Sequence, residues 1–226
     1  AYFGKDHCSV KSGRHDAFQW ATIARVGNEA GRLASRRRGT EGSTGLSSPK
    51  RYLWDEKAYA PGWRFNCSYV KTDNEPYATA APFSHLINET GEALYSLDED
   101  DRLPVFMPRY SRSSLMTFML AEVLAQALSQ INSPAQRSRQ GHTRVPRQLN
   151  SITLTVPPGM PQAERSILNE RMLQAIGLVW KSLGWHAGEE DPHQDQAVSP
   201  RMPIPSIRVE WDEASCGQLV YLYTEV

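Results

Sequence analysis

The sequence predicts an α/β fold, and the evidence lies between residues 151 and 223. Ser151–Val156 and Ser206–Trp211 alternate apolar and polar side chains, as strands with one better-buried face do. Apolar residues at helical spacing follow each of these strands, over 162–183 and 214–223. The order strand, helix, strand, helix is typical of a parallel sheet with covering helices.

Two long helices are predicted by apolar residues that recur every three or four positions. In the helix over 111–131, Ser111 or Ser113 can cap the start, and the expected buried face is Met116, Met119, Leu120, Val123, Leu124, Ala127 and Ile131. We expect the opposite, exposed face to carry Glu122, Gln126 and Ser129. In the helix over 162–183, the expected buried face is Leu168, Met172, Ala175, Ile176, Val179 and Leu183, opposite Glu170, Gln174 and Lys181.

The chain divides into three stretches. Residues 1–49 are expected to form part of an N-terminal hairpin and sheet, with a strand at 19–26 and a short helix at 29–38, while the first 20 residues show no clear period. Residues 50–150 are expected to form an inserted smaller subdomain that holds the helix over 111–131, with weak strands at 86–88 and 93–96 and a polar, basic loop at 133–148. Residues 151–226 carry the strand–helix–strand–helix core.

Composition limits the classes of function. The chain has 226 residues, with 25 Lys plus Arg and 25 Asp plus Glu, so its formal charge is zero. This argues against a nucleic-acid partner bound through net charge. The longest apolar stretch is broken before the roughly 18 residues that a membrane span needs. Three dispersed cysteines fit a reducing compartment, so we expect a cytoplasmic location. Both ends fall in mid-pattern, so we treat the chain as a fragment.

Self-contained catalytic motifs are absent from the sequence, which has no GxSxG, HExxH, GxxxxGK[ST] or GxGxxG. His186 and His193 flank an acidic group at 189–191, a pattern that fits either a metal site or a hydrophilic loop. The run of arginines at 36–38 fits either a helix end or a phosphate- or nucleic-acid-binding patch.

A spaced set of segments carries a resemblance. Thr153–Arg165 is a strand that ends in Val-Pro and leads into a helix with an arginine, and 175–178 is Ala-Ile-Gly-Leu. Residues 211–221, Trp-Asp-Glu-Ala-Ser-Cys-Gly-Gln-Leu-Val-Tyr, follow the second strand, and 25–30 and 49–53 lie upstream. In this order the segments resemble the nucleotide-binding domain of the DnaK-type (Hsp70) heat-shock chaperones, in the actin-like ATPase superfamily. In detail they look closest to the bacterial virulence-associated SrfB family.

The resemblance implies a fold and residue roles. The fold would be a partial actin-like ATPase lobe, ribonuclease H-like, with an inserted smaller subdomain. Lys50 matches the lysine that contacts the γ-phosphate and the attacking water, and Glu213 matches the glutamate that holds Mg²⁺ through a bound water. Pro157 and Arg165 match a switch proline and its relay arginine. A surface lysine, a helix-start acid, a strand stop and a solvated arginine remain the plainer interpretations of these four residues.

The implied function is that of the full-length parent. It would bind Mg-ATP between two lobes and couple hydrolysis to a conformational change that an unknown protein partner senses. Asp212 replaces the family's Asn and Ala214 replaces its Pro, and the family's phosphate and adenosine loops are not in these 226 residues. We therefore expect the fragment alone to be inactive and to bind ATP weakly. The alternative is a non-catalytic interaction or scaffold module, and secretion as a virulence factor stays open.

Overall fold

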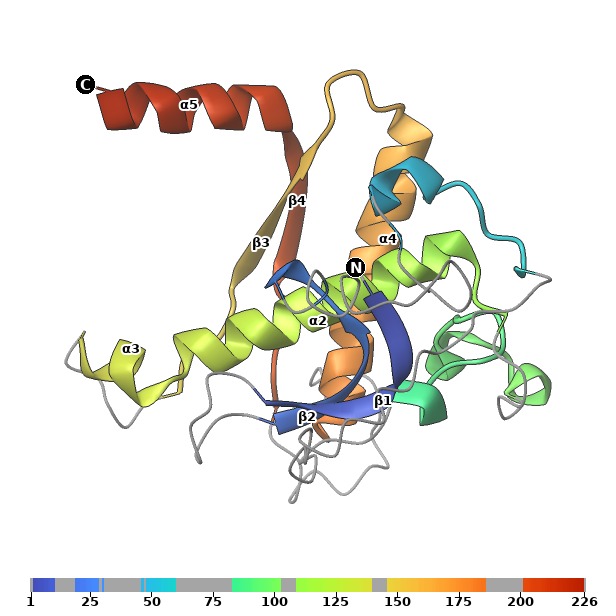
Figure 1. Ribbon diagram of the computed structural model, residues 1–226. Coiled ribbons are helices and arrows are strands. Elements are labelled where there is room, and N and C mark those ends of the chain that lie inside the picture. Colours follow the sequence, from blue (N-terminus) through green and yellow to red (C-terminus); the bar gives the residue numbers. More distant parts are fainter. Residues whose placement is uncertain are drawn as a thin grey trace, which may run out of the picture.

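The computed structural model describes residues 2–10, 19–28, 30, 46, 48–59, 83–102, 109–139, 146–185 and 201–225. Its strands are β1 (Tyr2–Val10), β2 (Gln19–Arg25), β3 (Ser151–Val156) and β4 (Ser206–Asp212). Its α-helices are α2 (Arg112–Ile131), α3 (Pro134–Ser138), α4 (Gln162–Ser182) and α5 (Glu213–Glu225) (Figure 1). Short 3₁₀ turns lie between β2 and α2, and the first of them is η1 (Pro49–Tyr52). The predicted α/β class is confirmed as a mixed α/β arrangement, and the more specific actin-like lobe stays a prediction.

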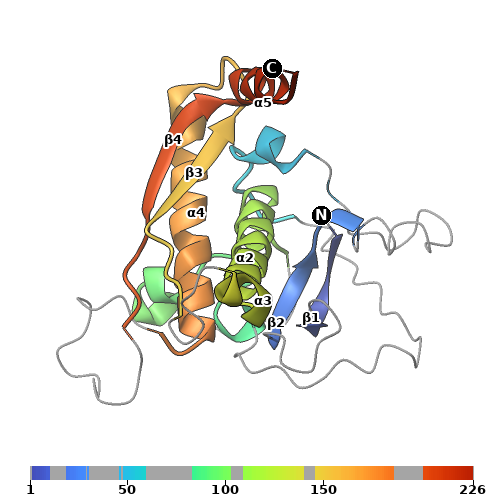
Figure 2. The same cartoon turned by 90° about the vertical axis from the view of Figure 1, so that its left-hand side faces the viewer.

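β3, α4 and β4 form one unit, as the alternating patterns predict. β3 and β4 pair in parallel, with Ser151 opposite Ser206 and Val156 opposite Asp212. α4 makes the crossover between them and lies along the sheet (Figure 2). The turn after β3 closes where Met160 N donates to Pro157 O at 3.2 Å, and the next-to-last turn residue, Gly159, has φ +77°. β3 and the start of α4 match their predicted bounds.

α2 packs between α4 and the antiparallel pair β1–β2, so the described elements form successive layers (Figure 2). Its buried side chains include Leu115, Met116, Phe118, Leu124 and Leu128, and they join those of α4 in one hydrophobic cluster. That cluster draws on all three stretches of the chain, from Ala24 to Val156 and beyond.

The predicted faces of the two long helices need correction. Glu122, expected outside, is 0% exposed, whereas Val123, expected inside, is 48% exposed. Gln174 of α4, also expected outside, is buried. Each helix is covered from more than one side, so the buried surface is wider than a single apolar stripe and takes in polar residues. Ser111 caps α2, where its hydroxyl accepts from Ser114 N at 3.0 Å.

By length and composition, α2 is a helix that could cross a membrane, the one such helix among the described residues. The expectation that no stretch reaches that length was therefore too strict. Most of α2 is buried inside the structure, and the core helix of a globular domain passes the same test. The length and composition of α2 are therefore not evidence for a membrane span.

Three other predictions differ from the structure. The first 20 residues, without a clear period, contain the strand β1, and pairing with β2 accounts for it. The loop expected at 133–148 begins with the helix α3, which Pro134 starts and Ser133 caps. The weak strands at 86–88 and 93–96 reduce to a single bridge between Ile87 and Ala93, followed by a 3₁₀ turn. The arginines at 36–38 and the histidines at 186 and 193 lie outside the described residues.

α5 does not cover the sheet, although covering helices were expected. It projects from the end of β4 away from the other layers (Figure 1). Its apolar side chains are accordingly exposed: Leu219, Val220, Tyr221, Leu222 and Tyr223. Cys216, expected to be a small buried side chain, is half-buried.

Candidate functional site

The carboxyl ends of β3 and β4 meet the η1 turn. Pro49 begins η1 and Lys50 follows, so the lysine side chain projects from a short, rigid turn. Lys50 Nζ donates to the backbone oxygen of Thr155, on β3, at 2.7 Å. It also forms an ion pair with Glu213, the first residue of α5 after β4. Residues more than a hundred positions apart therefore meet at one end of the parallel sheet.

A cleft of about 590 Å³ opens at this point. Four segments line it: the η1 turn, the middle of α2, the turn after β3 with the start of α4, and the start of α5. Its lining residues are Ser48, Pro49, Lys50, Arg51, Met119, Pro157, Pro158, Gly159, Met160, Glu164 and Glu213. The volume falls within the roughly 300–1,000 Å³ that is usual for small-molecule sites.

The η1 side of the cleft is held in place by the first turn of α2. Leu53 is buried in the core, and its backbone oxygen accepts from Ser113 Oγ, on α2, at 2.6 Å. Ser113 N donates to Asp55 O at 3.0 Å, and Arg112 forms an ion pair with the Asp55 carboxylate at 3.2 Å. The first turn of α2 therefore holds the chain segment that carries Lys50.

The α5 side of the cleft is ordered by a helix cap. Asp212 accepts from Ser215 N at 2.8 Å and from Ser215 Oγ at 2.6 Å. The hydrogen bond from the Ser215 hydroxyl, followed by that from the Ser215 backbone, lowers the pKa of Asp212 below its usual value. Because this cap orders the first turn of α5, it also fixes the position of Glu213, the first residue of that turn.

The four residues singled out by the resemblance are not equally placed. Lys50, Pro157 and Glu213 line the same cleft. Arg165 lies one residue after the lining residue Glu164, and its side chain donates to Met160 O at 3.1 Å, so it ties α4 to the Pro157 turn. The roles of all four stay predictions.

Sequence reasoning missed Met119 and Glu164 as cleft residues. The helical period placed Met119 on the buried side of its helix, but nothing in the pattern indicated a cavity there. Glu164, in the first turn of α4, carries a signal only as an acid near a helix N-terminus.

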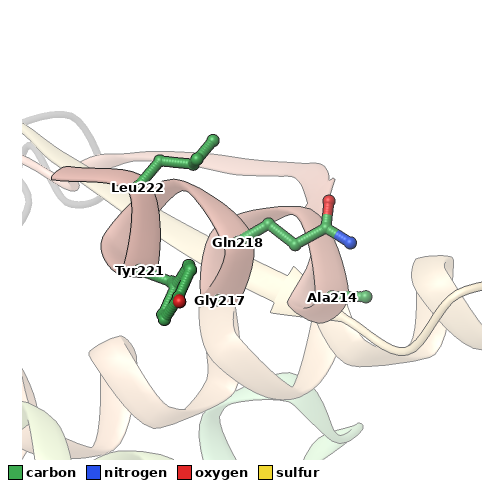
Figure 3. Close-up of a pocket in the computed structure, with 5 residues that line it drawn as sticks. All are labelled: Ala214, Gly217, Gln218, Tyr221 and Leu222. Carbon is green, nitrogen blue, oxygen red and sulfur yellow. The ribbon is translucent and has the colours of Figure 1, made fainter. Parts of the chain in front are cut away.

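A second hollow runs along α5. Its lining comes from one helix, and Figure 3 shows the side chains of Tyr221 and Gln218 on it beside Ala214 and Gly217. The lining is mainly apolar. This hollow lacks the paired charges that the first cleft presents.

The chemistry available in the cleft follows from its charges. Lys50 and Arg51 offer cations to an anionic ligand, and Glu213 and Glu164 offer carboxylates to a hydrated cation. Among the residues that the structure describes, no three His, Cys, Asp or Glu side chains are grouped to hold a metal ion directly.

These features define a class: a mixed α/β protein with a charged cleft at the carboxyl ends of a parallel strand pair. Comparison with protein families makes this more specific. The family model described as virulence factor SrfB matches residues 1–226, so the chain belongs to the virulence factor SrfB family. Searches of the curated proteins and of the solved structures gave no match. The resemblance to DnaK-type ATPases rests on the residues alone.

Proposed function

We propose that this member of the SrfB family contributes one wall of a Mg-ATP site, with Lys50 and Glu213 as the residues that meet the phosphates and the metal. The observation that carries the proposal is the meeting of Lys50, Thr155 O and Glu213 at the carboxyl ends of β3 and β4. In open α/β sheets, ligands bind outside the carboxyl ends of the strands. A cytoplasmic location, where ATP is abundant, belongs to the same proposal.

The residues present fit the phosphate end of a nucleotide. Lys50 is partly exposed on the cleft, so its ammonium can reach a phosphate after exchanging its bond to Glu213. Glu213, released from Lys50, is then free to accept from the water of a hydrated magnesium ion, which dehydrates reluctantly. Bound Mg²⁺ would supply neutralisation of the charge that develops on phosphoryl oxygens.

Two further residues suit a transmitting role in this proposal. Pro157 lines the cleft at the end of β3, and its restricted φ makes its turn a candidate for a two-position element. Arg165 holds that turn through Met160 O. A change at the cleft would therefore reach α4, and a partner protein could sense it there.

The test is nucleotide binding and turnover by the full-length protein, measured by calorimetry and phosphate release. We expect Lys50→Ala to weaken Mg-ATP binding about tenfold, the loss of one hydrogen bond to a charged group. Turnover should fall further, by about 10²-fold, because a cation aimed at developing charge is worth more in the transition state.

Lys57→Ala is the matched control. Lys57 lies seven positions along the same segment and is exposed. This variant should bind and turn over nucleotide like the wild type. If Lys50→Ala and Lys57→Ala behave alike, or if the wild type does not bind Mg-ATP at millimolar concentration, the proposal is wrong.

A second candidate is a non-catalytic interaction or scaffold module. Lys50 already has two protein partners, Thr155 O and Glu213, and so joins η1 to β3 and to the start of α5, as a structural ion pair would. Under this function, Lys50→Ala lowers stability and leaves any nucleotide binding unchanged. The same two measurements, with a denaturation curve for each variant, therefore distinguish the candidates.

A further inference from the structure

Arg171 is a buried cation with an unusual set of partners. Its side chain is 2% exposed and lies between α4 and α2. Its guanidinium donates to Ser113 Oγ at 2.9 Å, to both oxygens of Glu92 at 2.8 and 2.9 Å, to Gln174 Oε1 at 3.0 Å and to Glu56 Oε1 at 3.1 Å. We call these five residues the Arg171 cluster.

The cluster joins four segments of the chain. Ser113 belongs to α2 and Gln174 to α4, while Glu92 lies in the turn that Gly91 forms against α2. Glu56 lies six positions after Lys50, in the segment that follows η1. The cluster therefore contacts the 48–59 segment, which carries Lys50, at two points. One is Glu56, and the other is Leu53, whose backbone oxygen accepts from Ser113 Oγ at 2.6 Å.

We propose that Arg171 is a positioning residue for the cleft: through Glu56 and Ser113 it holds the 48–59 segment so that Lys50 meets Thr155 O and Glu213. Arg171 touches no cleft-lining residue itself in any contact described above and acts through others. The inference concerns the geometry of the cleft and stands whether or not its ligand is Mg-ATP.

The geometry of the guanidinium explains why arginine suits this role. Nε, Nη1 and Nη2 each take a different partner, so one rigid, planar group fixes three segments at once. Lysine, a point charge on a flexible stem, cannot hold the three in one geometry. The neighbouring Arg112–Asp55 ion pair supports the same segment from a partly exposed arginine, whereas the arginine of the Arg171–Glu56 pair is buried and also reaches the segment through Ser113.

The test is a zero-length cross-link at the cleft, with no nucleotide present. A carbodiimide condenses an amine and a carboxylate that are in contact into an amide, with loss of water, and peptide mass spectrometry measures the Lys50–Glu213 product. Glu56→Ala and Arg171→Lys should each lower its yield about fivefold, the effect of one lost charge-assisted hydrogen bond. Glu99→Gln, which changes an exposed acid elsewhere, should leave the yield at the wild-type level.

The cross-linking yield is measured at a temperature well below the unfolding midpoint of each variant, so that a change in stability alone does not alter the yield. A residue that only stabilised the fold would lower the midpoint and leave the yield unchanged, and this result would overturn the inference. Because Glu56 is 57% exposed, Glu56→Ala should fold even if Arg171→Lys does not, and its yield then decides the matter. Failure of ATP binding would not affect this result, so the two proposals fail separately.

Discussion

Two clusters of charge in this molecule are built in opposite ways. The Arg171 guanidinium, at the centre of the first cluster, is buried between α2 and α4, and each of its nitrogens has a protein partner. The Lys50–Glu213 ion pair lies at the rim of the cleft, with both side chains partly exposed. The cation of the first cluster is therefore buried, whereas the cation of the second borders the cleft.

The difference teaches what each cluster can do. A buried charge that loses its partners keeps the full cost of desolvation, so the Arg171 guanidinium must keep its partners. A partly exposed pair gains little from its own attraction, because water and salt screen it, and so it can exchange a protein partner for a ligand. The molecule thus has a fixed side and an adaptable side, both connected to the 48–59 segment.

The largest expected effect is on the fixed side. Arg171→Met removes the shared partner of Glu92, Gln174 and Ser113 and should lower the free energy of unfolding by about 3–5 kcal/mol, measured by urea denaturation. Lys50→Met, the matched change on the adaptable side, should cost about 1 kcal/mol or less. Equal losses in the two variants would remove the distinction between the two clusters.

The next effect compares two leucines. Leu168 of α4 is 0% exposed, and Leu168→Ala should cost about 2–5 kcal/mol through lost burial and a cavity. Leu219 of α5 is 55% exposed, and Leu219→Ala should change stability by less than about 0.5 kcal/mol. Denaturation midpoints of both variants, with an unchanged slope, make the comparison. A large loss on truncating Leu219 would show that α5 is packed in solution.

The elements of the core could be predicted from sequence because local pattern and tertiary burial agree there. β3 alternates strictly, and the apolar spacing of α4 ends at Gly184, whose φ is +69°. β1 could not be predicted, because it pairs with β2 at a bulge and its residues lack an alternating pattern. Tertiary contacts also outweighed the local pattern at Glu122. A charged side chain usually lies in water, but Glu122 is buried.

The candidate site was predictable only in part. Lys50, Pro157 and Glu213 were selected by a resemblance, and the parallel pairing of β3 and β4 explains why they lie close together. The contacts between Arg171 and Glu56 could not be predicted, since a periodic pattern places Arg171 on a helix but does not reveal its three partners from distant segments. Those contacts depend on how α2 and α4 pack, which no local pattern encodes.

The smallest expected effect is a pH dependence at the adaptable side. The pKa of Asp212 is lowered in the folded chain, mainly by the Ser215 hydroxyl, so the ionised carboxylate favours the α5 cap. The stabilisation of the cap by the ionised Asp212 carboxylate is fully present above the unfolded-state pKa of about 3.8. It is lost as the pH falls through the lower folded-state pKa. Asp212→Asn should therefore speed hydrogen exchange at the Ser215 amide by a few-fold at neutral pH, measured by NMR, with the difference from wild type vanishing in strong acid.

Glu210→Gln, which removes an exposed acid two residues earlier on β4, should show no difference at either pH. A constant difference at all pH values would mean that the side-chain shape of Asp212, and not its charge, orders the start of α5 beside Glu213.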